Sequence, residues 1–174
     1  MIDLAEIRAA AERIAAEAVV TPVIRSDELD DLTGSTVVFK DESRQRAGAF
    51  KFRGAFNRLS VIPAHDRQRG VVAVSSGNHG AAVACAAHLL DLRATVHVPE
   101  DVPNAKRALI EHFGAAIVTF PRSTADREAG ARRQVAATGA TFVHPFDDPV
   151  VMAGQGTTAL ELHEQVGALD VLLV

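Results

Sequence analysis

The sequence predicts an α/β protein in which parallel strands are covered by helices on both faces. Short runs rich in β-branched residues alternate with helical segments of about ten to fifteen residues, and this alternation is typical of βαβ units. The composition agrees with a folded domain, because 48% of the 174 residues are hydrophobic and 23% are charged. A chain of this length is long enough to bury a real core, as one domain or two small lobes.

The elements follow one another in a regular order. An opening helix is expected over residues 3–18, because Leu4, Ile7 and Ile14 recur at helical spacing. Thr21-Pro22 then forces the chain to extend. The strands expected after that point are residues 36–40, 71–74, 94–98, 115–120 and 141–146. Each of the last four strands is followed by an expected helix. In chain order these helices are an alanine-rich segment, PNAKRALIEHFG, a charged helix from about residue 123, and residues 156–166.

The last residues, LDVLLV, have the pattern of a buried strand that enters the sheet. A strand with no turn after it leaves two alternatives, a fragment of a longer protein or a strand that closes an edge of the sheet. We favour the fragment.

Charge and cysteine content restrict the partners and the compartment. The formal net charge is −4 and the basic residues are dispersed, so neither nucleic acid nor a membrane surface is an expected partner. No apolar run approaches the roughly 20 residues that a membrane span needs. The single cysteine, Cys85, cannot form an internal disulfide and is expected to be a small buried helix residue, so a cytoplasmic location is the default.

The turn SSGNH, residues 75–79, is a candidate anion site. It joins a predicted strand directly to a predicted helix, so backbone N–H groups, two hydroxyls and a carboxamide meet at a helix N-terminus. Ligands of parallel sheets bind beyond the carboxyl ends of the strands, which is where this turn lies. The alternative is that Ser76 or Asn78 merely caps the helix.

Lys51 is the candidate nucleophile. The chain has only three lysines, Lys40, Lys51 and Lys106, against fifteen arginines, and an amine can lose its proton near neutral pH whereas a guanidinium cannot. Phe50 and Phe52 flank Lys51, and apolar surroundings lower the pKa of an amine. The alternative is a lysine that simply extends along apolar neighbours to reach water.

Other common motifs are missing from the sequence. The glycines fit neither G-x-G-x-x-G after a strand nor a P-loop, so a nucleotide-binding module is disfavoured. The seven histidines form no HExxH or other close ligand pair, and no metal site is predicted.

Taken together, the motifs resemble those of the threonine and serine dehydratase group of fold-type II pyridoxal-phosphate enzymes, the tryptophan synthase β-like fold, which includes serine racemase and 3-hydroxyaspartate dehydratase. The similarity extends in order over nearly the whole chain. It comprises TPVIRSDELDDLTG, K-x-E-x-x-Q at Lys40, Glu42 and Gln45, GAFKFRGA, SSGNHGAAVA, VPEDVPNAKRALIEHFGA, VHPFDDPVVMAGQGT and DVLLV.

The resemblance implies pyridoxal 5'-phosphate as cofactor, with Lys51 as the Schiff-base residue. It further implies that Phe50 packs against the pyridine ring and that Asn78 donates a hydrogen bond to the phenolic oxygen. Ser75, Ser76, Gly77, Asn78 and His79 would bind the substrate carboxylate. The implied reaction is the conversion of L-threonine or L-serine to a 2-oxo acid and ammonia.

Ser76 leaves a second activity open. A serine at this position is implied to act as a proton donor on the face opposite Lys51, as racemisation requires. Serine racemase and 3-hydroxyaspartate dehydratase are therefore alternatives, and a non-catalytic fragment is another.

The sequence departs from the family pattern at Ala47 and Ala49, where hydroxyl residues are usual, and it lacks the glycine-rich phosphate loop expected directly after DVLLV. The resemblance also implies a division into a partial large, cofactor-binding domain, residues 1–50 and 146–174, and an inserted small domain, residues 51–145. A homodimer is a further implied property.

Overall fold

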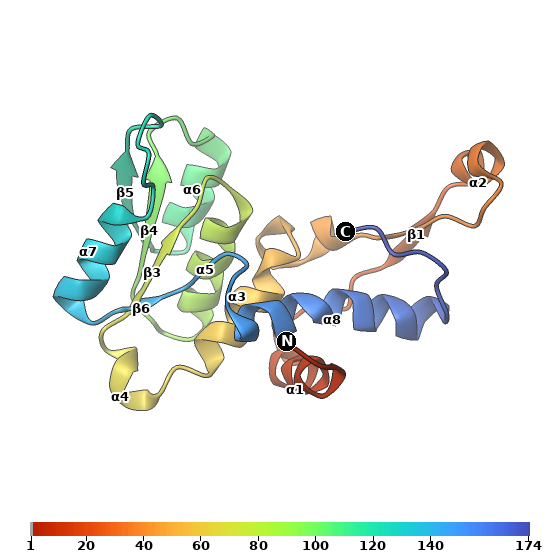
Figure 1. Ribbon diagram of the computed structural model, residues 1–174, viewed down its shortest axis with the longest axis horizontal. Coiled ribbons are helices and arrows are strands. Elements are labelled where there is room, and N and C mark those ends of the chain that lie inside the picture. The colour runs from red at the N-terminus through yellow and green to blue at the C-terminus, as the bar shows by residue number, and fades with distance from the viewer. Residues whose placement is uncertain (1) are drawn as a thin grey trace.

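Four parallel strands form the main sheet in the computed structural model, which describes residues 2–174 (Figure 1). Their order is β5-β4-β3-β6, and every neighbouring pair is parallel. A helix between successive strands returns the chain to the same end of the sheet, which is why the pairs are parallel. The strands are β3 (Val71–Val74), β4 (Ala94–Pro99), β5 (Ala116–Phe120) and β6 (Thr141–Phe142).

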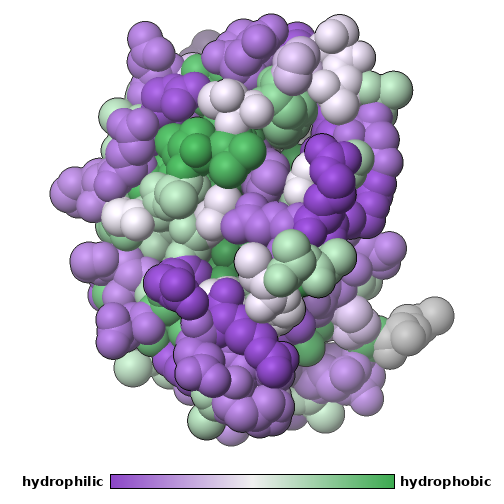
Figure 2. Space-filling view, turned by 90° about the vertical axis from the view of Figure 1, so that its left-hand side faces the viewer, coloured by the Kyte–Doolittle hydropathy of each residue, from purple (hydrophilic) through white to green (hydrophobic). Residues whose placement is uncertain are grey.

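Helices cover both faces of this sheet, as predicted (Figure 1). Helices α5 (Asn78–Leu89) and α6 (Asn104–His112) lie on one face, and α7 (Ala129–Thr138) lies on the other. The buried side of α5 consists mainly of alanines together with Cys85, which is 3% exposed as expected for a core position. The outward-facing side of this part of the molecule, seen in Figure 2, is largely hydrophilic, with a group of apolar side chains to the upper left of its centre.

A second group of elements packs beside the sheet. Helix α3 (Lys51–Ser60) lies between α5 on one side and α8 (Pro149–Val166) on the other, and α1 (Leu4–Ile14) packs on α8. A two-stranded antiparallel ribbon extends away from them (Figure 1). The remaining elements are β1 (Val23–Arg25), α2 (Asp27–Thr33), β2 (Val38–Lys40), the 3₁₀ turns η1 (Glu42–Arg44) and η2 (Arg46–Gly48), and α4 (Ala64–Arg67).

Helix α8 begins seven residues before the expected start at residue 156. Asp148 caps it by accepting hydrogen bonds from the backbone N–H groups of Val150 and Val151, and Pro149 occupies the first turn, where its missing N–H costs nothing. Gly154 and Gly156 lie inside the helix, although glycine usually weakens helices. The close packing of these two positions explains why glycine is found there.

Helix α8 crosses α3 at a contact between two glycines. A Cβ atom built on Gly154 would lie 2.6 Å from the Cα of Gly54 and 2.7 Å from the carbonyl oxygen of Arg53. Real Cβ atoms do not approach other atoms this closely, so only glycine lets the two backbones meet. The crossing fixes the position of α3 relative to α8.

Three further expected elements have different bounds in the structure. The strand expected over 141–146 ends at Phe142, because the carbonyls of Val143 and Pro145 bind side chains instead of a neighbouring strand. Helix α7 begins at Ala129, after a turn in which Asp126 accepts a hydrogen bond from the Glu128 N–H. Helix α1 ends at Ile14, and turns follow it.

The prediction of a strand at LDVLLV is also wrong. Residues 169–174 contain no strand, and the side chains of Val171 and Leu173 are 74% and 89% exposed. A strand needs a partner for its backbone groups, and none pairs with this segment within residues 2–174.

Candidate active site

The segment that follows β6 brings the two predicted sites together. The Lys51 amine donates a hydrogen bond of 2.9 Å to the carbonyl oxygen of Pro145, and the His79 Nε2 lies 3.0 Å from the carbonyl oxygen of Val143. Strands β3 and β6 are neighbours, so the turn after β3 and the segment after β6 lie at the same carboxyl edge of the sheet. Lys51 and the 75–79 turn are therefore held by one short piece of backbone.

Lys51 occupies the first position of α3 and is half-buried. Burial lowers the pKa of its amine, because the charged form loses hydration. The amine lies 4.9 Å from the centre of the Phe50 ring, whereas Phe52 points into the core and is fully buried. The two phenylalanines thus have different surroundings: Phe50 borders the amine and Phe52 anchors the helix.

The 75–77 turn leaves the N-terminus of α5 open. Gly77 is the N-cap residue, and no side chain of residues 2–174 caps the helix. The Ser75 hydroxyl instead accepts a 3.0 Å hydrogen bond from the Gly77 N–H, while Ser76 and Asn78 are exposed. The alternative of a simple helix cap by Ser76 or Asn78 is therefore wrong for this structure.

Gly77 adds room to the turn, since no heavy atom of residues 2–174, apart from those of Gly77 and its two chain neighbours, lies within 4 Å of the position that a Cβ would occupy there. Uncapped N–H groups at the start of a twelve-residue helix, with open space before them, suit a carboxylate or a phosphate.

His79 is buried beside this turn, with 4% of its surface exposed. Burial lowers its pKa from 6.5 to about 4, so the imidazole is neutral near pH 7. With Nε2 facing the Val143 carbonyl, the proton lies on Nε2, and the buried Nδ1 has no hydrogen-bond partner within residues 2–174. Such an atom is a free acceptor at the edge of the turn.

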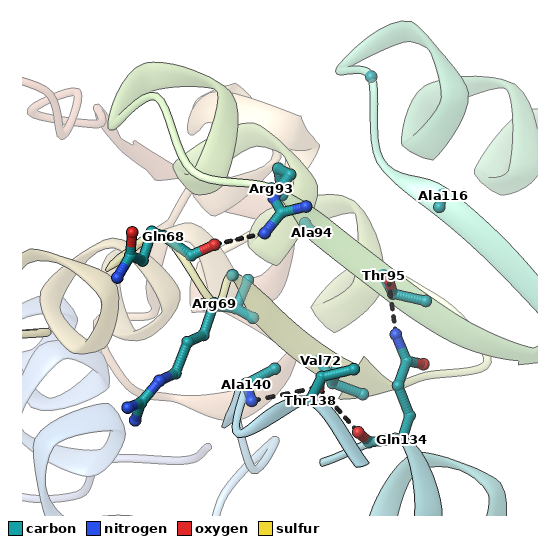
Figure 3. Close-up of a pocket in the computed structure, with 13 residues that line it drawn as sticks. Gln68, Arg69, Val72, Arg93, Ala94, Thr95, Ala116, Gln134, Thr138 and Ala140 are labelled. Atoms are coloured by element: carbon teal, nitrogen blue, oxygen red, sulfur yellow. Dashed lines mark hydrogen bonds between the residues drawn. The ribbon is translucent and has the colours of Figure 1, made fainter. Parts of the chain in front are cut away.

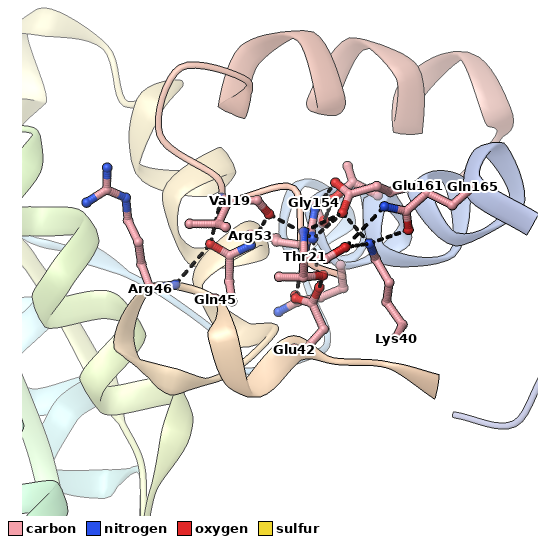
Figure 4. Close-up of polar contacts among 12 residues, drawn as sticks. Val19, Thr21, Lys40, Glu42, Gln45, Arg46, Arg53, Gly154, Glu161 and Gln165 are labelled. Atoms are coloured by element: carbon pink, nitrogen blue, oxygen red, sulfur yellow. Dashed lines mark hydrogen bonds and ion pairs between the residues drawn. The ribbon is translucent and has the colours of Figure 1, made fainter. Parts of the chain in front are cut away.

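A polar cluster around Arg53 was not predicted as part of the site (Figure 4). Arg53 is 1% exposed and its guanidinium binds the carboxylates of Glu42 at 2.7 Å and Glu161 at 3.0 Å. Burial alone would lower the pKa of Arg53, but hydrogen bonds to both carboxylates raise it, so the cation persists. Lys40 also contacts Glu161, at 2.5 Å. The K-x-E-x-x-Q motif was the signal in the sequence that could have revealed this cluster.

A groove of about 580 Å³ lies at the opposite, amino edge of the sheet (Figure 3). Arg69 points away from Arg93 there: Arg93 donates to the Gln68 carbonyl, and Arg69 pairs with Asp66. The two cations do not converge, so the groove has no built anion site.

Within residues 2–174, no helix is both long and apolar enough to cross a membrane. The same residues contain no group of three or more histidine, cysteine, aspartate or glutamate side chains placed to hold a metal ion.

Comparison with known proteins gives a consistent set of relatives. The chain is 48% identical to L-threo-3-hydroxyaspartate ammonia-lyase of Saccharomyces cerevisiae, over 88% of this chain and 47% of that protein. It is 42% identical to serine racemase of Schizosaccharomyces pombe, over 97% of this chain and 52% of that protein. The chain therefore spans about half the length of the curated relatives it matches.

Solved structures show the same fold. The structure of maize serine racemase matches 97% of this chain and 51% of its own length, with a TM-score of 0.93 and 40% identity. The profile of the family described as "Pyridoxal-phosphate dependent enzyme" matches residues 14–174. The predicted fold-type II architecture is thus confirmed, and the chain belongs to the family of pyridoxal-phosphate-dependent enzymes.

Proposed function

We propose that this chain provides the lysine-bearing part of an ammonia-lyase that acts on a β-hydroxy amino acid, with L-threonine or L-serine as the substrate. The observation that supports the proposal most is the pairing of Lys51 and His79 with one backbone segment, through Pro145 and Val143. This pairing places a partly desolvated amine beside an uncapped helix N-terminus. An amino acid presents both an α-proton that such an amine can accept and a carboxylate that such a turn can bind.

The residues present fit the cofactor of the family. Lys51 would hold it through the amine, Phe50 would border its ring, and Asn78 would face its phenolic oxygen. When bound, pyridoxal phosphate withdraws electrons from the α-carbon of an amino acid and so acidifies the α-proton. The free acceptor on His79 and the open backbone at Gly77 show that this edge of the sheet is not closed by the protein's own groups.

The chain's own groups then have distinct tasks. The Ser75–His79 turn would orient the substrate carboxylate through backbone N–H groups and the helix dipole. The Lys51 amine, once the amino group of the substrate has displaced it, would accept the α-proton, and its lowered pKa favours the neutral form that this task needs. Loss of the β-hydroxyl and hydrolysis of the resulting enamine would give a 2-oxo acid and ammonia.

We infer the same division into domains that the sequence suggests. All four parallel strands lie within residues 71–142, inside the proposed small domain of residues 51–145. Residues 1–50 and 146–174 would belong to the cofactor domain, and α3 packs against elements of both parts.

The test measures cofactor absorbance and ammonia release by the purified protein with L-threonine, L-serine and L-threo-3-hydroxyaspartate. Lys51→Ala is expected to abolish both the absorbance of the lysine-bound cofactor and the release of ammonia. Lys106→Ala, on α6, is the matched control and should retain both. Cofactor absorbance that survives in Lys51→Ala would refute the role of this lysine, and absence of absorbance in the unaltered protein would favour the non-catalytic alternative.

Racemisation is the second candidate, because Ser76 has an exposed side chain on the same turn. Chiral analysis of the serine recovered from the assay distinguishes it. If Ser76 exchanges a proton on the second face, Ser76→Ala should abolish formation of D-serine while ammonia release continues. Equal loss of both products would argue against a separate role for the hydroxyl.

A further inference from the structure

The buried cluster around Arg53 has a role that the proposed reaction leaves unassigned. Arg53 lies two residues after Lys51 in the first turn of α3. Two residues correspond to about 200° of rotation in a helix, so the two side chains leave α3 on opposite faces. Lys51 faces the segment after β6, and Arg53 faces α8 and the N-terminal part of the chain.

The cluster joins parts of the chain that are far apart in sequence (Figure 4). The Arg53 guanidinium binds Glu42 through Nε at 2.9 Å and through Nη2 at 2.7 Å, so this contact is a bidentate fork. It also donates to both oxygens of Glu161, at 3.0 and 3.1 Å. A planar guanidinium can satisfy this arrangement, whereas the point charge of an ammonium cannot.

The other members of the cluster complete its hydrogen bonds. The Thr21 hydroxyl donates to Glu42 at 2.6 Å, and the Thr21 N–H donates to Glu161 at 3.0 Å. Lys40 donates to the Thr21 carbonyl at 2.5 Å. Arg53 and Lys40 supply two positive charges against the two negative charges of Glu42 and Glu161, so the cluster is neutral.

The K-x-E-x-x-Q motif now has a structural explanation. Lys40 and Glu42 belong to the cluster directly. Gln45 is 3% exposed and binds the backbone of Val19 in both directions, with its amide donating to the carbonyl at 2.8 Å and its oxygen accepting from the N–H at 3.0 Å. Arg53 donates to the same carbonyl at 3.3 Å.

The cluster fixes the rotation and height of α3 at its first turn, and the glycine crossing with α8 fixes its distance. Gly154, Thr157 and Glu161 are spaced three and four residues apart on α8, so the crossing and the charged contact lie on one face of that helix. A helix held this way cannot turn about its own axis without breaking buried ion pairs.

We propose that Arg53, held by Glu42 and Glu161, is a positioning residue that aims the Lys51 amine at the carboxyl edge of the sheet. The proposal rests on the function proposed for Lys51 and adds the group that sets its orientation. On the side of the amine, the positive charge of Lys51 acts on the titratable His79 of α5, and His144 from the segment after β6 acts on His79 as well.

The test measures the pH dependence of lysine modification in the cofactor-free protein. A small amine-reactive anhydride is applied over a range of pH, and the extent of reaction at each of the three lysines is read by peptide mass spectrometry. Lys106, on α6, is the internal reference. The readout needs neither cofactor nor substrate, so it is separate from the absorbance test of the proposed function.

Arg53→Lys retains the charge but removes the bidentate fork. We expect the titration midpoint of Lys51 to move upward, toward that of an ordinary solvated lysine, while the midpoint of Lys106 stays unchanged. Glu161→Gln, a milder change that leaves an acceptor for Arg53, should shift Lys51 in the same direction by a smaller amount. If Arg53→Lys does not fold, Glu161→Gln provides the test of the proposal.

Two controls separate positioning from a general loss of stability. Ile110→Val shortens a buried side chain on α6, and Arg69→Lys changes an exposed ion pair on the far side of the sheet. Both should leave the Lys51 midpoint where it is in the unaltered protein. A folded Arg53→Lys or Glu161→Gln protein with an unchanged Lys51 midpoint, or an equal shift in Ile110→Val, would overturn the proposal.

Discussion

His79 should make the stability of the fold depend on pH in a range where most carboxyl groups are already ionised. Its pKa is about 4 in the folded chain and 6.5 when the side chain is free. Because the folded value is lowered, the unfolded chain binds the proton more readily, and acid shifts the equilibrium toward unfolding. The stability is full above the unfolded pKa and is lost as the pH falls toward the folded one.

The size of the effect follows from these two pKa values. Between about pH 7.5 and pH 5, the unfolded histidine becomes almost fully protonated while the folded one stays neutral, which costs about 2 kcal/mol of unfolding free energy. The full cost is reached only when the pH is below the folded pKa, and it amounts to about 3 kcal/mol. Solvent screening is small because the side chain is buried.

The assay is urea unfolding followed by circular dichroism at several pH values in this range. His79→Gln keeps a donor for the Val143 carbonyl but does not titrate, so its stability should fall by about 2 kcal/mol less than that of the unaltered protein between the two pH limits. His112→Gln, at an exposed position on α6, is the matched control and should retain the unaltered pH dependence.

The two proteins are compared by how much their free energy of unfolding changes with pH, and not by its absolute value. This is necessary because His79→Gln also changes packing and so shifts the stability at every pH. If His79→Gln and the unaltered protein lose the same free energy between pH 7.5 and pH 5, the imidazole is not held neutral by burial. The Nδ1 atom would then not be a free acceptor either.

Three further predictions concern α8. Gly154→Ala should destabilise the fold by about 1 to 3 kcal/mol because a methyl group would collide with the backbone at Gly54, whereas Gly156→Ala meets only a movable side chain and should cost less; urea midpoints compare the two. Asp148→Ala removes the cap of α8 and should cost about 1 kcal/mol or more, measured in the same way, with Asp148→Asn restoring part of the loss. Burial raises the pKa of Glu161, but the hydrogen bonds from Arg53 hold this pKa below the ordinary 4.5. The ionised Glu161 therefore stabilises the fold fully above pH 4.5, and this stabilisation is lost as the pH falls through the lowered pKa. Glu161→Gln should therefore weaken this acid-induced loss, and an unchanged acid transition would contradict the assignment.

Local patterns were sufficient for the elements and side chains whose neighbours in sequence define them. Lys51 and the 75–79 turn stand out because each combines an unusual residue type with a strand or helix boundary. The alternation of strands and helices also predicted the parallel sheet. These features depend on a few consecutive residues, and the structure confirms the sheet.

Contacts between residues that are far apart in the sequence could not be predicted from such local patterns. Pro145 lies 94 residues from Lys51, and Glu161 lies 108 residues from Arg53, so no local signal reports either hydrogen bond. Strand β1 has only three residues, too few for a period-two pattern to appear, whereas β2 lies within the strand expected over residues 36–40. LDVLLV shows the reverse case, in which strand propensity alone is insufficient without a partner.

The contact between Gly54 and Gly154 also constrains how this sequence can change. Glycine has the smallest side chain available, so an added methyl at one position cannot be offset by a smaller residue at the other. In most pairs of core residues, a larger side chain at one position can be offset by a smaller one at the other, but neither of these glycines has a side chain that could be made smaller. Any variant that enlarges either position must find its compensation elsewhere, by moving a whole helix, and α3 would take the Lys51 amine with it.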